Sequence, residues 1–156
     1  MLHIKKGIEN FELTKKRMEI TKRADGIKII NDSYNASFES MQASIKYLSN
    51  MEHGRKIAVL GDMFELGKFS KELHKKVGEE IVKNKIDILL CSGENSKYII
   101  EEAQKQGMAK EKTFFAHTKE ELYEMIKNIL KENDNVLIKA SNGMKFYEIA
   151  EKLINF

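Results

Sequence analysis

Short apolar runs alternate with longer segments of helical periodicity along most of this chain, and that alternation restricts the folds open to it. The runs are four or five residues long and lie at residues 27–30, 56–60, 87–91, 113–116 and 136–140. Strands that read as nearly continuous apolar runs are typical of a parallel sheet whose two faces are both covered by helices. Parallel neighbours need a long crossover connection, and the segments between the runs can each supply a helix.

Helical patterns follow each apolar run. Leu73, Val77 and Ile81 recur at a spacing of four, which places them on one face of a helix. Helices are expected at residues 38–50, 70–85, 95–106, from 118 onward and at 144–155. Thr118 and Glu121 have the spacing of a capping box, in which each side chain bonds the other residue's backbone N–H.

Five β–α units in succession predict an α/β fold, a Rossmann-like doubly wound sheet with helices on both faces. The sheet is expected to be mostly parallel, with five strands, and residues 17–24 are expected to add an edge strand. No linker rich in proline, glycine or serine divides the chain, and no repeat is evident. Residues 1–156 are therefore expected to form a single domain.

Composition excludes several classes of protein. The 27 basic and 24 acidic residues give a net charge of +3, and no basic stripe is interleaved with aromatic residues, so nucleic-acid binding is not expected. The apolar runs are far too short to cross a bilayer, and the N-terminal stretch lacks the apolar region of a signal peptide. Cys91 is the single cysteine, which excludes an internal disulfide. We therefore expect a cytoplasmic protein without membrane insertion.

Ligands of doubly wound sheets bind beyond the carboxyl ends of the strands. The loops expected at that edge are residues 31–37, 61–69, 92–95, 117–118 and 141–143. Asp32 and Asp62 each follow a strand directly, and each has two interpretations: a structural cap, or a ligand contact such as an acceptor for ribose hydroxyls. Tyr34 offers a ring for stacking and a hydroxyl for bonding.

The usual nucleotide-binding fingerprints are missing from these loops. The stretch GDMFELGKF has five residues between its glycines where a phosphate-binding loop has four, and it ends in Phe69 instead of a hydroxyl residue. No GxGxxG or GxSxG motif is present. A phosphate-accepting receiver domain would need an aspartate at the end of the third strand, where this chain has Cys91-Ser92-Gly93.

Several motifs together resemble the C-terminal domain of the Mur ligases. NDSYNAS (31–37) resembles D-S-Y-N-A-N-P, and GRKIAVLGDMFELG (54–67) resembles G-R-x-I-A-V-L-G-D-M-x-E-L-G. LHKKVG (73–78) follows at the expected place, VLIKASNGM (136–144) is similar to V-L-V-K-G-S-R-G-M, and RME (17–19) is similar to the end of G-R-x-E. The GDMxELG stretch is typical of the branch that joins D-alanyl-D-alanine to UDP-N-acetylmuramoyl-tripeptide in peptidoglycan synthesis.

The resemblance implies an ATP-dependent peptide ligase with two further domains, one for the UDP-linked substrate and a central ATPase domain that binds ATP and Mg²⁺. This chain would contribute the dipeptide-binding surface and part of the ATP-binding surface on domain closure. It would be inactive alone, hold no cofactor tightly, and carry no catalytic or metal-binding residue of its own. Its partners would be the central domain, D-alanyl-D-alanine and UDP-N-acetylmuramoyl-tripeptide.

The resemblance also implies two groups of site residues. ATP would be contacted by Arg17, Asp32, Tyr34 and Asn35. The dipeptide substrate would be contacted by Asp62, Lys139, Ser141, Asn142 and Gly143.

This chain departs from the family pattern at three places. Lys16 replaces a glycine, Ser37-Phe38 replaces Asn-Pro, and residues 140–143 read Ala-Ser-Asn-Gly instead of Gly-Ser-Arg-Gly. Asn142 thus replaces an arginine that could bind a carboxylate through two hydrogen bonds. Lys145 could substitute for that arginine as a point charge. The alternative function is a free-standing α/β module that binds or senses a small molecule.

Overall fold

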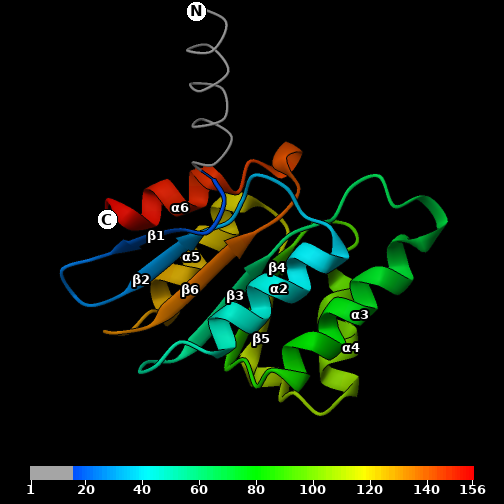
Figure 1. Ribbon diagram of the computed structural model, residues 1–156, viewed down its shortest axis with the longest axis horizontal. Coiled ribbons are helices and arrows are strands. Elements are labelled where there is room, and N and C mark those ends of the chain that lie inside the picture. The colour runs from blue at the N-terminus through cyan, green and yellow to red at the C-terminus, as the bar shows by residue number, and fades with distance from the viewer. Residues whose placement is uncertain (1–15) are drawn as a thin grey trace, which may run out of the picture.

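A six-stranded sheet runs through the computed structural model, which describes residues 16–156 (Figure 1). The strands are β1 (Glu19–Lys22), β2 (Lys28–Asn31), β3 (Lys56–Leu60), β4 (Ile88–Ser92), β5 (Thr113–Ala116) and β6 (Asn135–Lys139). Their order is β1-β2-β6-β3-β4-β5, with β1 antiparallel to β2 and all other neighbours parallel. The predicted edge strand is thus confirmed as β1. The N-terminal stretch in which no signal peptide is expected lies largely outside the described residues.

Helices cover both faces of the sheet. The α-helices are α2 (Phe38–Ser49), α3 (Ser70–Lys83), α4 (Lys97–Lys105), α5 (Lys119–Ile129) and α6 (Tyr147–Ile154), and the short 3₁₀ turns are η1 (Gly67–Phe69), η2 (Lys110–Lys112) and η3 (Asn142–Met144). In Figure 1, α2, α3 and α4 lie on one side of the sheet, and α5 and α6 lie on the other. The predicted doubly wound α/β fold is confirmed.

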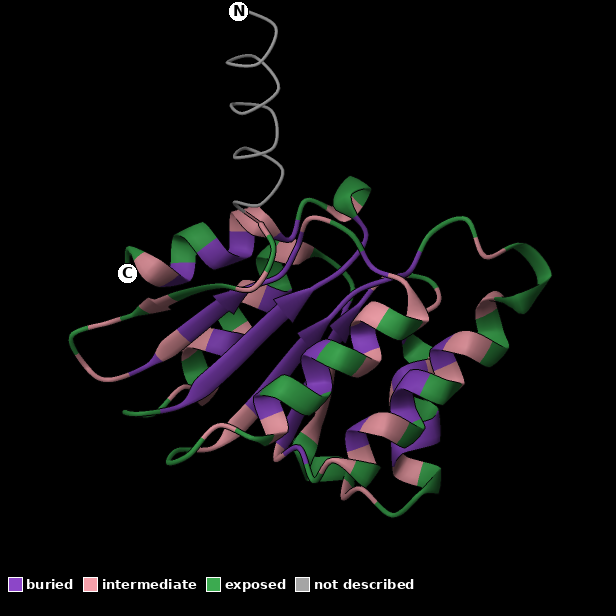
Figure 2. Cartoon of the chain, viewed as in Figure 1, coloured by how far each residue is buried: buried purple, intermediate pink, exposed green. Residues whose placement is uncertain are grey.

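The core consists of two apolar clusters, one on each face of the sheet. Neighbouring residues of a strand point to opposite faces, so Ile29 belongs to one cluster and Ile30 to the other. In Figure 2 the central strands are buried along almost their whole length. Burial on both faces explains why these strands read as continuous apolar runs.

Two predictions about helix ends were wrong in detail. The last α-helix begins at Tyr147 instead of residue 144, because Lys145 adopts a left-handed conformation with φ 55° after the η3 turn. Thr118 does accept the N–H of Glu121, as a capping box requires. The Glu121 carboxylate, however, accepts the N–H of His117 instead of that of Thr118, so the box is incomplete.

Within residues 16–156, no helix is both long and apolar enough to span a membrane.

Candidate ligand site at the carboxyl edge of the sheet

A buried ion pair joins the ends of two neighbouring strands. Asn31 of β2 pairs with Ile138 of β6, so Asp32 and Lys139 leave the sheet side by side. Lys139 Nζ lies 2.8 Å from Asp32 Oδ2, and the two side chains are only 3% and 8% exposed. Such a pair loses hydration on both charges, and it is stable only when further hydrogen bonds satisfy its remaining atoms.

Those further hydrogen bonds come from three parts of the chain. Asp32 Oδ1 accepts the backbone N–H of Met18 at 3.1 Å, and Asp32 Oδ2 accepts the hydroxyl of Ser44 on α2. Lys139 Nζ also donates to the carbonyl oxygen of Asn35 at 3.0 Å. The pair therefore connects β6, α2, the loop after β2 and residues 16–18, which we call the entry segment.

An open cleft of about 400 Å³ borders this ion pair at the N-terminus of α2. We call it the exit cleft; it is lined by Arg17, Met18, Asp32, Asn35, Ser37, Ser40, Ala43, Ser44 and Lys139. The Arg17 guanidinium carbon lies 4.3 Å from the centre of the Tyr34 ring, within the range of a cation–π contact. A cation beside the positive end of a helix dipole favours an anionic ligand.

The four residues predicted to contact ATP all lie in or beside the exit cleft. Arg17 and Asn35 are exposed, so their polar groups can reach a ligand. Tyr34 is half-buried beneath Arg17, and its backbone N–H donates to the carbonyl of Lys16. Asp32 is 6% exposed, and its carboxylate already accepts three hydrogen bonds within the chain.

Asp62 lies at the end of β3, where it caps the start of α4. Its Oδ1 atom accepts the backbone N–H groups of Asn95 at 3.0 Å and Ser96 at 2.7 Å. Gly93 packs so closely that a Cβ there would lie 2.4 Å from the same oxygen. Of the two interpretations of Asp62, the structure shows the structural cap, and contact with the dipeptide stays a prediction.

Two loops at this edge are tied together, and we call them the paired loops (residues 61–69 and 141–144). The backbone N–H of Ser141 donates to the carbonyl of Asp62 at 2.9 Å, and the Ser141 hydroxyl accepts the N–H of Phe64 at 2.8 Å. A Cβ on Gly143 would lie 2.7 Å from the Phe64 ring, so the ring covers the glycine backbone. The structure thus brings together Asp62, Ser141, Asn142 and Gly143, and their contact with the dipeptide stays a prediction.

Lys139 is the exception within that predicted group. Its backbone carbonyl accepts the N–H of Gly61, the first residue of the paired loops. Its side chain turns instead to Asp32 and Asn35, beside the residues predicted to contact ATP. The sequence alone did not reveal this grouping, because it depends on β6 being inserted between β2 and β3.

His74 also supports the paired loops, a role that the sequence alone did not reveal. It is fully buried on α3; its Nε2 atom accepts the N–H of Met63 at 3.0 Å, and its Nδ1 atom lies 2.6 Å from the carbonyl oxygen of Ser70. An Nε2 that accepts leaves Nδ1 as the donor, so the ring is neutral. The LHKKVG motif, which contains His74, was the sequence feature that could have indicated this role.

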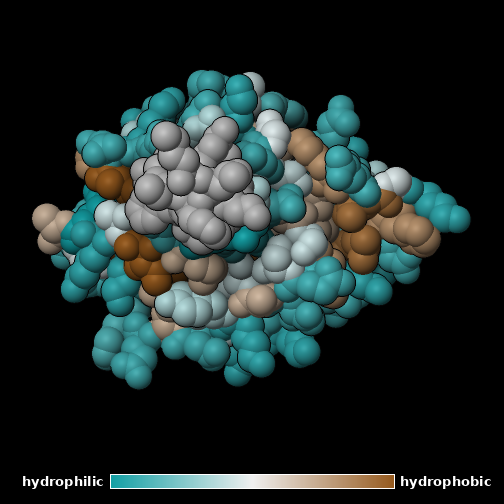
Figure 3. All heavy atoms as spheres, turned by 45° about the horizontal axis from the view of Figure 1, so that its top comes forward, coloured by the Kyte–Doolittle hydropathy of each residue, from teal (hydrophilic) through white to brown (hydrophobic). Residues whose placement is uncertain are grey.

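The exposed surface near the paired loops is partly apolar. Phe64 and Phe69 are 45% and 55% exposed. Figure 3 shows a hydrophobic patch at the right of the view, on the side where the segment between β3 and α3 projects in Figure 1. Half-exposed aromatic rings beside a polar edge are typical of a surface that contacts a ligand or another domain.

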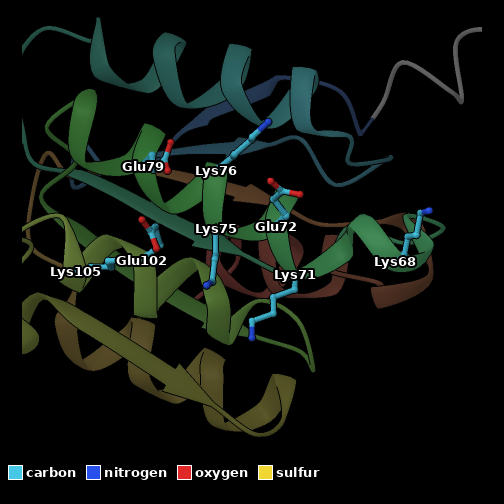
Figure 4. Close-up of a pocket in the computed structure, with 8 residues that line it drawn as sticks. All are labelled: Lys68, Lys71, Glu72, Lys75, Lys76, Glu79, Glu102 and Lys105. Atoms are coloured by element: carbon cyan, nitrogen blue, oxygen red, sulfur yellow. The ribbon is translucent and has the colours of Figure 1, made fainter.

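Two other features of residues 16–156 carry no comparable chemistry. A groove of about 490 Å³ between α3 and α4 is lined by lysines and glutamates, of which Glu102 is buried (Figure 4). Burial raises the pKa of the Cys91 thiol well above its ordinary value, with a further increase from the nearby Asp62 charge. A thiol held protonated in this way is a poor nucleophile.

The fold and the polar strand exits define a Rossmann-like α/β domain with its ligand edge at the carboxyl ends of the strands. The family model described as "Mur ligase, glutamate ligase domain" matches residues 16–142. The chain therefore belongs to the Mur ligase C-terminal domain family.

Curated relatives carry a more specific name. The UDP-N-acetylmuramoyl-tripeptide–D-alanyl-D-alanine ligase of Bacillus subtilis is 39% identical over 150 residues, which is 96% of this chain and 33% of that protein. The ligase of the same name from Buchnera aphidicola is 36% identical over 153 residues, covering 97% of this chain and 32% of the relative. This chain thus spans about a third of the length of these relatives.

Solved structures agree with this family. The MurF ligase of Thermotoga maritima in complex with ADP matches with a TM-score of 0.74 at 29% identity, over 90% of this chain and 30% of that one. A domain of a Haemophilus ducreyi ligase matches in fold alone, with a TM-score of 0.62 at 19% identity, over 89% of this chain and 98% of that one. The latter was crystallised as a separate domain, so a domain of this fold can be prepared without the rest of its enzyme.

Proposed function

We propose that this chain is the C-terminal domain of an ATP-dependent ligase that adds D-alanyl-D-alanine to UDP-N-acetylmuramoyl-tripeptide in the cytoplasm. The observation that carries the proposal is the match to the Bacillus subtilis ligase of that name along 96% of the chain. The geometry supports it, because the motifs of the resemblance meet at one edge of the sheet as the exit cleft and the paired loops.

The residues of the exit cleft fit one part of a nucleotide. Arg17 supplies a cation, Asn35 supplies an exposed amide, and α2 supplies the positive end of its dipole. Among residues 16–156, no three His, Cys, Asp or Glu side chains are grouped to hold a metal ion.

In the proposed reaction, ATP supplies the phosphoryl group that converts the tripeptide carboxylate into an acyl phosphate, and the amine of the dipeptide then displaces phosphate. The role of this chain is to bind and orient. Arg17 and Asn35 contact the nucleotide, and the paired loops face the dipeptide. Closing this edge over the ATPase domain aligns the amine with the acyl carbon and excludes the water that would hydrolyse it.

A chimera tests the proposal directly. This chain replaces the matching C-terminal third of the Bacillus subtilis relative, and phosphate release is measured with and without tripeptide substrate and dipeptide. We expect release that requires both substrates, and no release from the isolated chain. A folded chimera that releases no phosphate, together with an active Bacillus subtilis parent, would overturn the proposal.

Calorimetry separates this function from a free-standing binding module. Half of a cleft buries only part of a ligand, so the isolated chain should bind ATP and D-alanyl-D-alanine weakly. Dissociation constants in the micromolar range for the isolated chain would favour the free-standing module instead.

A further inference from the structure

We propose that Lys139 is a positioning residue for the nucleotide side of the site, because it holds the Asp32 carboxylate that fixes the entry segment and Arg17. The inference rests on the proposed function and refines it. It moves Lys139 from the predicted dipeptide group to the nucleotide group, although Lys139 itself touches neither ligand.

The first step is the burial of the Lys139 ammonium. The side chain is 3% exposed, and two of the three donors of the ammonium are used by Asp32 Oδ2 and the Asn35 carbonyl. A group that is almost fully enclosed and spends two donors within the chain is placed to hold its neighbours in position. Its two partners both belong to the loop after β2.

The second step leads from Asp32 to Arg17. Asp32 Oδ1 accepts the N–H of Met18, whose φ of 48° lies in the left-handed region. A residue with a side chain costs about 1 kcal/mol in that region, so a surrounding contact must maintain the conformation. Arg17 directly precedes this residue, and its guanidinium lies over Tyr34. The Asp32 contact therefore sets the direction from which Arg17 enters the exit cleft.

The third step concerns the paired loops, which are held by other groups. Their contacts run through the Ser141 hydroxyl, the Asp62 carbonyl and the His74 ring. Lys139 meets the paired loops through its backbone carbonyl, which a side-chain substitution leaves in place. Loss of the ammonium should therefore disturb the nucleotide side and spare the dipeptide side.

Amide hydrogen exchange tests whether Lys139 positions the entry segment through Asp32, without any assumption about ligase activity. NMR measurements on the 156-residue chain compare Lys139→Met with the control variant Lys28→Met. Lys28 is the first residue of β2, at the end of the strand away from Asp32. In Lys139→Met the Met18 amide should exchange roughly tenfold faster, whereas amides of β3 keep their protection. Unchanged Met18 protection in Lys139→Met would overturn the inference.

A compensating variant covers the case in which Lys139→Met does not fold. Adding Asp32→Asn removes the buried carboxylate charge that the lysine neutralised, while an amide oxygen can still accept the Met18 N–H. The double variant should recover both folding and Met18 protection. Recovery of folding without recovery of Met18 protection would contradict the proposed link from Asp32 to the entry segment.

Kinetics of the chimeric ligase complete the test. Lys139→Met should raise the KM for ATP by roughly tenfold and leave the KM for D-alanyl-D-alanine within about twofold. A rise confined to the dipeptide KM would refute the positioning role and return Lys139 to the dipeptide group. An inactive unsubstituted chimera would count against the proposed function alone, because the exchange experiment tests the positioning role of Lys139 separately.

Discussion

Replacing His74 by alanine should destabilise the domain by removing the support of the first paired loop. The backbone N–H of Met63 is buried and donates to His74 Nε2, so the substitution leaves it without this acceptor. An unsatisfied buried donor costs about 1–3 kcal/mol. An unfilled imidazole volume on the order of 60 Å³ adds about 1.5 kcal/mol at roughly 24 cal/mol per Å³.

The expected loss for His74→Ala is therefore about 3 kcal/mol in the free energy of unfolding, measured by urea denaturation. For a domain of this size, that loss lowers Tm by roughly 6–12 °C. His74→Gln should recover part of the loss, since its amide can again present an oxygen near the Met63 N–H. His117→Ala is the matched control, because His117 is exposed and no hydrogen bond of its ring is recorded among the described residues.

Two results would refute this reasoning. A loss below about 1 kcal/mol for His74→Ala would mean that the Met63 N–H finds water or another acceptor at little cost. An equal loss for His117→Ala would mean that the effect reflects a general sensitivity to histidine replacement.

Three further predictions follow from contacts elsewhere in the chain. Gly93→Ala should lower the free energy of unfolding by about 2–4 kcal/mol in urea titrations, because φ is +133° and a Cβ would strike the Asp62 carboxylate. Cys91 should react with a thiol reagent at pH 8 only as fast as the domain unfolds, since burial raises its pKa; rapid labelling of the native state would contradict this. The hydrogen bond from Lys119 lowers the pKa of the half-exposed Glu148, so its small stabilising effect is present above the unfolded pKa and lost as pH falls through the folded pKa. Carboxyl NMR titration of Lys119→Met should show the Glu148 pKa rising toward its ordinary value.

The sheet was predictable because each strand is a short apolar run, and these runs alternate regularly with helical segments along the sequence. The strands over residues 56–60 and 113–116 match the predicted bounds, and the strands predicted at residues 87–91 and 136–140 are displaced by one residue. The helix ends were less predictable. The left-handed conformation of Lys145 and the hydrogen bond from the His117 N–H to the Glu121 carboxylate are local features that a helical period does not encode.

The site was only partly predictable, for a different physical reason. The sequence places Asp32 and Lys139 107 positions apart, and nothing in either motif indicates that they form one ion pair. Their contact follows from the position of β6 beside β2, which is a property of the sheet order. In the same way, the role of Asp62 as a cap follows from the position of the turn before α4 beside the end of β3.

The exit cleft and the paired loops are therefore stabilised by two different kinds of contact. The exit cleft depends on charge, because the Asp32–Lys139 pair joins the entry segment to α2 and β6. The paired loops depend on neutral hydrogen bonds from His74 and Ser141. A buried charge pair tolerates loss of one partner poorly, whereas neutral hydrogen bonds can be exchanged for similar ones at lower cost. The exit cleft should accordingly accept fewer substitutions than the paired loops, a difference that the proposed roles of the cleft in nucleotide binding and of the loops in contacting the amine substrate would require.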